Sequence, residues 1–270
     1  MEKHLICLDL DGTLLTDEKV ISQYTKTVLL ELKQQGHELI ISTGRPYRAS
    51  ELYYRELGMD TPIVNFNGAF VHHPQDFNFE TLHTPLDLNV AVEIARRVPE
   101  LKIQNVIAEI KDTVYLHYHD SVLFDAFSMG EPTVKVGELT QTMTDGPTTI
   151  LIQAEEDEMP AIRDELDNVF AEAIEHRRWG APYPVLEIVK KGISKAVGVE
   201  HVRKYLGVDK ENTIAFGDED NDTEMLKYVR HGVAMGNATD EIKDVSDHIT
   251  ISNNEDGIGR FLNDYFKLNL

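Results

Sequence analysis

Two aspartates separated by one residue, Asp9 and Asp11, follow a short apolar run near the beginning of the sequence. Because side chains alternate along an extended strand, the two carboxylates would project toward the same side. Two carboxylates that converge repel each other unless a cation lies between them or one of them stays protonated. The pair therefore suits a metal ligand that also acts as a nucleophile, beside a neighbouring acid/base.

Two further polar stretches contain residue types that could bind phosphate. Thr43 and Gly44 follow an apolar run and would offer a hydroxyl and backbone N–H groups to a phosphate oxygen. Lys195 stands directly before a helix-like segment and could hold a phosphate as a point charge. Each stretch taken alone is explained as well by an ordinary strand-to-helix turn or by a solvated lysine, so their combination carries the argument.

An acidic loop that contains Asp218 and Asp222 follows the apolar run 213–216. Its spacing resembles a calcium-binding loop, but Thr223 replaces the required Gly and Val229 replaces the required Glu. Hard oxygen ligands that are supplied sparsely, with room for water and phosphate oxygens, favour Mg²⁺. The loop therefore predicts a magnesium site rather than a calcium site.

The segments that position these residues alternate between strand-like and helix-like patterns. Ser22 is placed to cap a helix that Gly36 would end. This order predicts a parallel sheet with helices on its faces, and ligands bind at the carboxyl ends of such strands. The strand-like apolar runs are residues 5–8, 39–41, 62–64, 213–216, 232–235 and 248–251.

The middle of the chain has a different pattern, with longer β-like stretches at 113–118 and 148–153. A helix among them would place four apolar residues on one face: Ile162, Leu166, Val169 and Phe170. We therefore predict an α/β protein with a Rossmann-like parallel-sheet core formed by residues 1–84 and 186–270. An inserted α+β domain of residues 85–185 would interrupt that core.

The chain is acidic, with 26 Lys and Arg against 47 Asp and Glu and a formal net charge of −21 over 270 residues. It lacks the basic surface that nucleic acid binding requires. No apolar run approaches the roughly 20 residues that span a bilayer, and the run before Asp9 is too short for a signal peptide. We therefore expect a cytoplasmic protein that binds neither nucleic acid nor membrane. An anionic substrate would need a metal ion or fixed cations to offset repulsion.

Taken together and in this order, the polar stretches resemble the motifs of the haloacid dehalogenase-like superfamily. More narrowly, they resemble the Cof-type hydrolases, which carry the larger α/β cap between the second and third motifs. The chain departs from the family pattern at Ala196, where Gly is common, and at Lys190, where Pro is frequent, and both affect only loop shape. The resemblance covers nearly the whole chain, through residues 9–15, 42–45, 67–69, 192–195, 217–222, 233–238 and 254–257.

The resemblance implies a Mg²⁺-dependent phosphomonoesterase in which Asp9 attacks phosphorus and becomes an aspartyl phosphate. Asp11 would protonate the leaving oxygen and later deprotonate the hydrolytic water. The metal ion would be held by the Asp9 carboxylate, the Asp11 backbone carbonyl and Asp218, with Asp222 as a supporting group. The implied phosphate-binding groups are the Leu10 amide, Thr43, the Gly44 amide, Lys195 and Asn221.

The substrate implied by the resemblance is a small phosphorylated metabolite, and the inserted domain would act as the cap that selects it. Sugar phosphates, pyridoxal phosphate, flavin mononucleotide and the riboflavin precursor 5-amino-6-(5-phosphoribitylamino)uracil all remain open. A phosphomutase of hexose phosphates is one alternative. A non-catalytic phosphometabolite-binding regulator is another, although it should have lost part of the machinery, and Asp9, Lys195 and Asp218 are all present. No cap residue is assigned a role, and the oligomeric state is not predicted.

Overall fold

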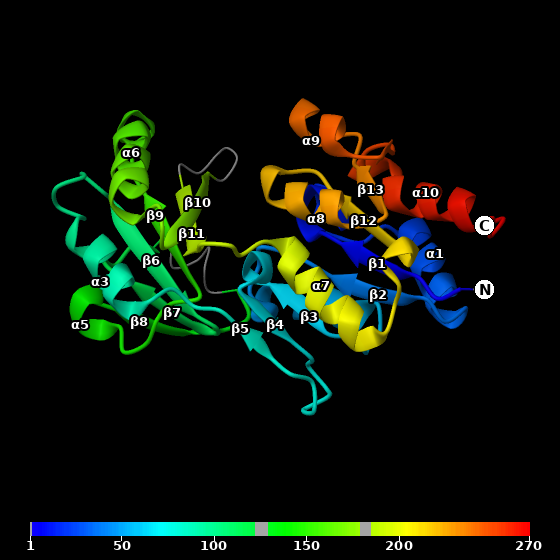
Figure 1. The fold of residues 1–270 in the computed structure, drawn as a ribbon, viewed down its shortest axis with the longest axis horizontal. Coiled ribbons are helices and arrows are strands. Elements are labelled where there is room, and N and C mark those ends of the chain that lie inside the picture. Colours follow the sequence, from blue (N-terminus) through cyan, green and yellow to red (C-terminus); the bar gives the residue numbers. More distant parts are fainter. Residues whose placement is uncertain (1, 122–128, 179–184) are drawn as a thin grey trace. The chain divides into compact units, whose positions relative to one another are not determined.

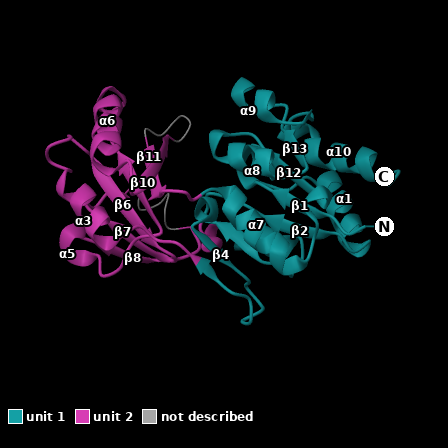
Figure 2. Ribbon diagram, viewed as in Figure 1, with its two compact units in different colours: residues 1–45, 50–82, 194–270 teal, residues 46–49, 83–193 magenta. Residues whose placement is uncertain are grey.

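The computed structural model describes residues 2–121, 129–178 and 185–270. Figure 1 traces the chain through its helices and strands. The chain folds into two compact units, which Figure 2 colours separately. Unit 1 comprises residues 1–45, 50–82 and 194–270, and unit 2 comprises residues 46–49 and 83–193.

Unit 1 is built around a five-stranded parallel sheet in the order β14-β13-β12-β1-β2. Every residue of the neighbouring strands β1 and β12 is buried, as expected for parallel strands covered on both faces. Five of the predicted apolar runs form these strands: β1 (Leu5–Leu8), β2 (Glu38–Ile41), β12 (Thr213–Gly217), β13 (His231–Ala234) and β14 (His248–Ile249).

The first helix of unit 1 begins and ends close to the residues that the sequence predicts. The Ser22 hydroxyl accepts a hydrogen bond from the N–H of Thr25 and caps α1, as the sequence predicts. That helix ends just before Gly36, which adopts a left-handed φ of +90°. The helices are α1 (Gln23–Gln34), α2 (Glu51–Glu56), α7 (Lys195–Leu206), α8 (Thr223–Tyr228), α9 (Asp240–Val245) and α10 (Gly257–Phe266).

The apolar run 62–64 does not extend the parallel sheet, contrary to the expectation from the sequence. It forms β3 (Ile63–Asn65), which pairs antiparallel with β4 (Phe70–His72) in a separate sheet completed by β5 (Leu82–His83). Only an isolated parallel bridge between Ser42 and Val64 continues the pairing from the end of β2. The connection from β3 to β4 is too short for a crossover helix, so the chain can only pair antiparallel there.

Unit 2 contains a six-stranded sheet in the order β10-β11-β9-β6-β7-β8, antiparallel except between β7 and β8. One face packs on helices α3 (Leu88–Arg96), α5 (Leu139–Thr142) and α6 (Met159–Phe170). The predicted apolar face of α6 is correct for three of its four residues, but Val169 is 46% exposed. The strands are β6 (Asn105–Ile110), β7 (Thr113–Leu116), β8 (Thr133–Val136), β9 (Thr149–Gln153), β10 (Ile174–Arg178) and β11 (Val185–Lys190).

The predicted fold class, a parallel-sheet core with an inserted α+β domain, is confirmed. The long insertion that forms most of unit 2 runs from residue 83 to residue 193, whereas the sequence suggested residues 85–185. The second boundary differs because β11 pairs with β9 and β10, so it completes the sheet of unit 2.

A short segment far from the insertion in sequence, residues 46–49, also belongs to unit 2. Its Arg48 forms a buried ion pair with Glu109 of β6, and a second guanidinium nitrogen donates to the carbonyl of Lys111 at 3.2 Å. These bonds attach the segment to the sheet of unit 2.

Among the helices in the described part of the chain, none combines the length and the apolar character needed to cross a bilayer.

Candidate active site

Asp9 is the first residue after β1 and lies at the carboxyl end of the parallel sheet of unit 1. Its N–H donates to the carbonyl of Phe216 in β12 at 3.3 Å, which holds the ends of these neighbouring strands together. The side chain is almost fully buried, with 5% of the residue exposed. A buried carboxylate at this edge stands where ligands bind to open α/β sheets.

Lys195 is the first residue of α7 and is completely buried. Its Nζ donates to Oδ1 of Asp9 and to Oδ1 of Asp222, each at 2.7 Å. A buried ammonium group requires such partners, because burying an unpaired charge is very costly. The alternative interpretation of Lys195 as a solvated surface residue is therefore wrong.

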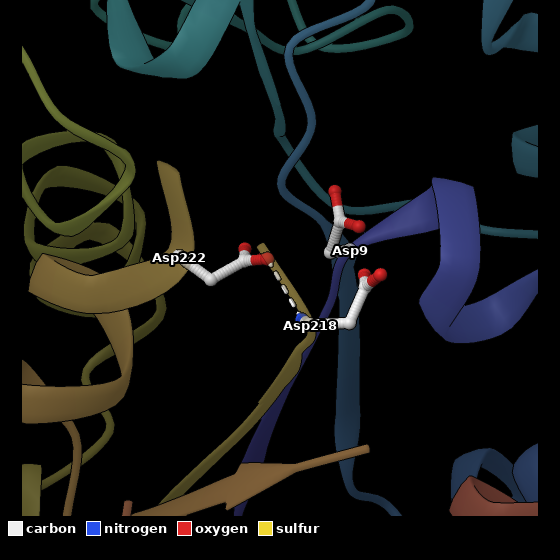
Figure 3. Close-up of side chains that lie close together, drawn as sticks. All are labelled: Asp9, Asp218 and Asp222. Atoms are coloured by element: carbon white, nitrogen blue, oxygen red, sulfur yellow. Dashed lines mark hydrogen bonds between the residues drawn. The ribbon is translucent and has the colours of Figure 1, made fainter. Parts of the chain in front are cut away.

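Asp218 follows the last residue of β12 and completes a cluster of three buried carboxylates. Asp9, Asp218 and Asp222 each offer one oxygen within 4.8 Å of the others (Figure 3). Asp218 accepts a hydrogen bond from the Thr13 hydroxyl at 2.6 Å. Asp222 is oriented by the N–H groups of Asp218 and Glu219, which donate to its Oδ2 at 3.0 and 3.2 Å. The predicted convergence of Asp9 and Asp218 is present in the structure.

The electrostatics of this cluster favour a bound cation. Burial raises the pKa of Asp9 to about 7, even though the charge of Lys195 opposes the shift. Burial and the charge of Asp9 raise the pKa of Asp218 to about 8. Burial alone would lower the pKa of Lys195, but the charges of Asp222 and Asp9 outweigh it and raise that pKa.

Three carboxylates around one ammonium leave an excess of negative charge in a buried site. Hard carboxylate oxygens are the ligands preferred by Mg²⁺, Mn²⁺ and Ca²⁺. The residues present therefore fit a divalent cation.

Gly12 allows the backbone to pass close to Asp218. It adopts a φ of +72°, and a Cβ atom at this position would lie less than 3.0 Å from the Asp218 carboxylate. We expect Gly12→Ala to lower the free energy of unfolding by about 1–2 kcal/mol from the left-handed backbone alone. The clash should also displace Asp218 and weaken cation binding.

Gly207→Ala is the matched control, because Gly207 also has a left-handed φ, +63°, but no atom lies within 4 Å of its added Cβ. Urea unfolding should show a comparable loss from the backbone in both variants, while Mg²⁺ titration should separate them. Equal cation affinities in the two variants would contradict this account.

The side chain of Asp11 does not join the carboxylate cluster, which corrects the geometry expected from the sequence. β1 ends at Leu8, and residues 10–14 form an irregular turn, so strand alternation does not apply. The Asp11 carboxylate accepts two hydrogen bonds from Arg45, both at 2.6 Å, and one from Lys19 at 2.8 Å. Burial would raise the pKa of Asp11, but these hydrogen bonds and charges lower it to about 2.

The predicted phosphate-binding residues lie around the same end of the sheet. Thr43 is buried, and its hydroxyl accepts a hydrogen bond from the N–H of Arg45 at 3.2 Å. Gly44 lies against the side chain of Asn67, which in turn accepts a hydrogen bond from Asn221 at 3.0 Å. Leu10 is buried within the turn that follows Asp9. These contacts bring loops from three parts of the chain together.

Sequence reasoning gave no role to several residues that shape this site. Arg45 and Asn67 stand inside the motifs that were recognised, yet their side-chain partners depend on how separate loops meet. Asn237 also stands in a recognised motif and donates to the Gly12 carbonyl at 2.8 Å. Thr13 likewise stands in a recognised motif, residues 9–15, and donates to Asp218. Lys19 carries no comparable signal, because a solvated lysine is common.

Comparison with known proteins identifies the family of the chain. The profile of the haloacid dehalogenase-like hydrolases matches residues 6–262. The chain is 51% identical over 265 residues to the 5-amino-6-(5-phospho-D-ribitylamino)uracil phosphatase YitU of Bacillus subtilis (strain 168), and the match covers 98% of each protein. It is 28% identical over 276 residues to the pyridoxal phosphate phosphatase YbhA of Escherichia coli (strain K12), covering 97% of this chain and 98% of that protein.

Among solved structures, a haloacid dehalogenase-like hydrolase from Bacteroides thetaiotaomicron has a TM-score of 0.84 at 26% identity. That match covers 98% of this chain and 100% of the other. The chain therefore belongs to the haloacid dehalogenase-like hydrolases, which confirms the family and the class of enzyme expected from its motifs.

Proposed function

We propose that this hydrolase is a Mg²⁺-dependent phosphatase that acts on 5-amino-6-(5-phospho-D-ribitylamino)uracil through an aspartyl phosphate on Asp9. The observation that carries the chemistry is the meeting of Asp9, Lys195 and Asp218 in one buried cluster. The choice of substrate is supported by the 51% identity to YitU along 98% of both chains.

The reaction begins with attack by a carboxylate oxygen of Asp9 on phosphorus. The new O–P bond forms as the bond to the leaving oxygen breaks, and Asp11 gives that oxygen its proton. Water then attacks the phosphorus of the aspartyl phosphate, and Asp11 takes a proton from it. Asp9 and inorganic phosphate are released.

The charge on the phosphoryl group has to be matched in the transition state. The Asp9 carboxylate, the Asp11 backbone carbonyl and Asp218 would hold Mg²⁺, with Asp222 supporting them. When bound, the ion supplies positive charge that lets an anionic nucleophile approach an anionic phosphate. The Lys195 ammonium, the Thr43 hydroxyl, the Asn221 amide and the backbone N–H groups of Leu10 and Gly44 would bind the phosphoryl oxygens.

Asp11 cannot act as an acid while it is paired as described above. Arg45 and Lys19 hold its pKa at about 2, so the carboxyl group is ionised at neutral pH. The proposed mechanism therefore requires the bonds from Arg45 and Lys19 to Asp11 to break before Asp11 carries its proton.

A panel of phosphorylated metabolites assayed with Mg²⁺ tests the proposal. The riboflavin precursor phosphate should give the highest kcat/KM, above pyridoxal phosphate, flavin mononucleotide and hexose phosphates. A clear preference for another compound would contradict the proposed substrate. Interconversion of hexose phosphates without release of phosphate would point to a mutase, and phosphate binding without turnover would point to a regulator.

Cation binding should release protons near neutral pH. Because the pKa values of Asp9 and Asp218 lie at about 7 and about 8, both groups hold protons that a cation must displace. The affinity for Mg²⁺ should therefore increase as pH rises from about 6 to about 8. Calorimetric titration in buffers of different ionisation enthalpy measures the released protons. An affinity that stays constant over this range would argue against these pKa values.

The predicted absence of nucleic acid and membrane partners, and the predicted cytoplasmic location, remain predictions. The charge of −21 supports the first of them.

A further inference from the structure

We propose that Asn67 is a positioning residue for phosphoryl transfer, whose side-chain amide sets the place of Asn221 relative to the phosphate-binding turn at Thr43 and Gly44. The inference rests on the proposed phosphatase function. It gives a role to the motif 67–69, which the mechanism above does not use.

The side chain and the backbone of Asn67 bond to two different loops. Oδ1 of Asn67 accepts a hydrogen bond from Nδ2 of Asn221 in the acidic loop at 3.0 Å. The N–H of Asn67 donates to the carbonyl of Thr43 at 3.1 Å. The residue is 2% exposed, so these bonds form away from bulk water, where hydrogen bonds orient their partners strongly.

The amide of Asn67 also packs directly against the backbone of Gly44. A Cβ atom added to Gly44 would lie 3.3 Å from both Oδ1 and Nδ2 of Asn67. The amide is therefore close to the turn whose N–H groups would bind phosphate, and it connects that turn to Asn221.

The turn that carries Asn67 reaches a third loop as well. A Cβ atom added to the next residue, Gly68, would lie less than 3.0 Å from the carbonyl oxygen of Ser194, directly before Lys195. The single turn at residues 66–68 thus contacts the loops that carry Thr43, Lys195 and Asn221.

The backbone of this turn is unusual. Phe66, Asn67 and Gly68 all have left-handed φ values, +49°, +53° and +97°. Such a conformation is unfavourable for a bulky residue such as Phe66 and persists only where the surroundings hold it. Strained backbone of this kind concentrates at functional sites, which agrees with a positioning role.

Positioning matters here because Thr43, Lys195 and Asn221 must meet on one phosphoryl group. A displacement of about 1 Å in a reacting geometry can lower the rate by as much as ~100-fold. Loss of the Asn67 amide would leave Asn221 without this bond and would open space beside Gly44. The fold would be retained, since the left-handed turn does not need the amide.

The decisive variant is Asn67→Gly, because Gly accepts the left-handed φ and removes only the side chain. We expect a modestly lower unfolding temperature, because the Asn221 amide loses its buried partner, with the fold retained. We also expect a fall in kcat of ~10- to 100-fold, with a smaller change in KM. Asn269→Gly is the matched control, since Asn269 has a φ of +60° and lies near the C-terminus, outside the proposed site. It should keep kcat.

A double-mutant cycle identifies the partner. If Asn67 acts through Asn221, then Asn221→Ala should cost little more once Asn67→Gly is present, because coupled residues are not additive. A kcat of Asn67→Gly within twofold of the unaltered protein, or losses that multiply independently, would overturn the positioning role while leaving the phosphatase function intact. An unaltered protein that releases no phosphate from any substrate in the panel would overturn both.

Discussion

Asp9→Asn is expected to lower phosphate release by at least about 10⁴-fold, because the amide cannot form the aspartyl phosphate. The fold should survive, since Asn has the same shape and removes one of three crowded carboxylates. In the absence of cation, at a pH above the pKa of Asp9, the variant should be at least as stable as the unaltered protein, because a buried charged carboxylate destabilises the fold there. Steady-state assays with the substrate panel and thermal unfolding without cation measure the two effects.

Asp264→Asn makes the same chemical change at an exposed position in α10 and should leave both quantities unaltered. A retained turnover in Asp9→Asn would show that another group attacks phosphorus. Loss of the fold in Asp9→Asn, by contrast, would show that this carboxylate is structural.

Lys195→Met is expected to affect both activity and stability. The variant leaves Asp9 and Asp222 without the ammonium group that both contact at 2.7 Å. Removing one partner of a buried ion pair lowers the free energy of unfolding by about 3–5 kcal/mol. Loss of a fixed positive charge at the phosphoryl group should lower kcat by at least about 10²-fold.

The loss of stability in Lys195→Met should depend on pH in a defined direction. The charge of Lys195 lowers the pKa of Asp9, so removing it raises that pKa above about 7. A carboxyl group whose pKa is raised on folding destabilises the protein as pH rises through that value. The free energy of unfolding that Lys195→Met loses relative to the unaltered protein should therefore be smaller at a pH of about 5.5 than at about 8.

Urea unfolding at the two pH values measures this difference in Lys195→Met. Lys191→Met is the matched control, because the Lys191 side chain is 44% exposed and pairs with an exposed glutamate. A deficit of equal size at both pH values would mean that lost packing, rather than uncompensated charge, explains the effect.

The core of this fold could be predicted from the sequence because its signals are local. Continuous apolar runs identify buried parallel strands, and polar residues directly after them must meet at one edge of the sheet. Asp9 and Asp218 follow the neighbouring strands β1 and β12, so their convergence is a consequence of strand order. The family motifs supplied that order, which apolar patterns alone do not give.

The sequence-based predictions that were wrong concern contacts between segments that are distant in the sequence. The apolar run 62–64 has the same pattern as a core strand, and only its short connection to β4 reveals antiparallel pairing. A lysine at the start of a helix is usually exposed, and the sequence alone does not show that Asp9 and Asp222 pair with Lys195. The orientation of Asp11 depends on Arg45, which is 34 residues away in the sequence. Strand alternation alone therefore could not predict it.

The assignment of residues 46–49 to unit 2 has a consequence for protein engineering. A chimera made by exchanging residues 83–193 for the inserted domain of a relative would leave Arg48 behind and remove its buried partner, Glu109. The Arg48 guanidinium would then lack the Glu109 carboxylate, and it lies only three residues from Arg45, which binds Asp11. Successful grafts should therefore transplant two pieces of sequence, the long insertion and the matching tetrapeptide.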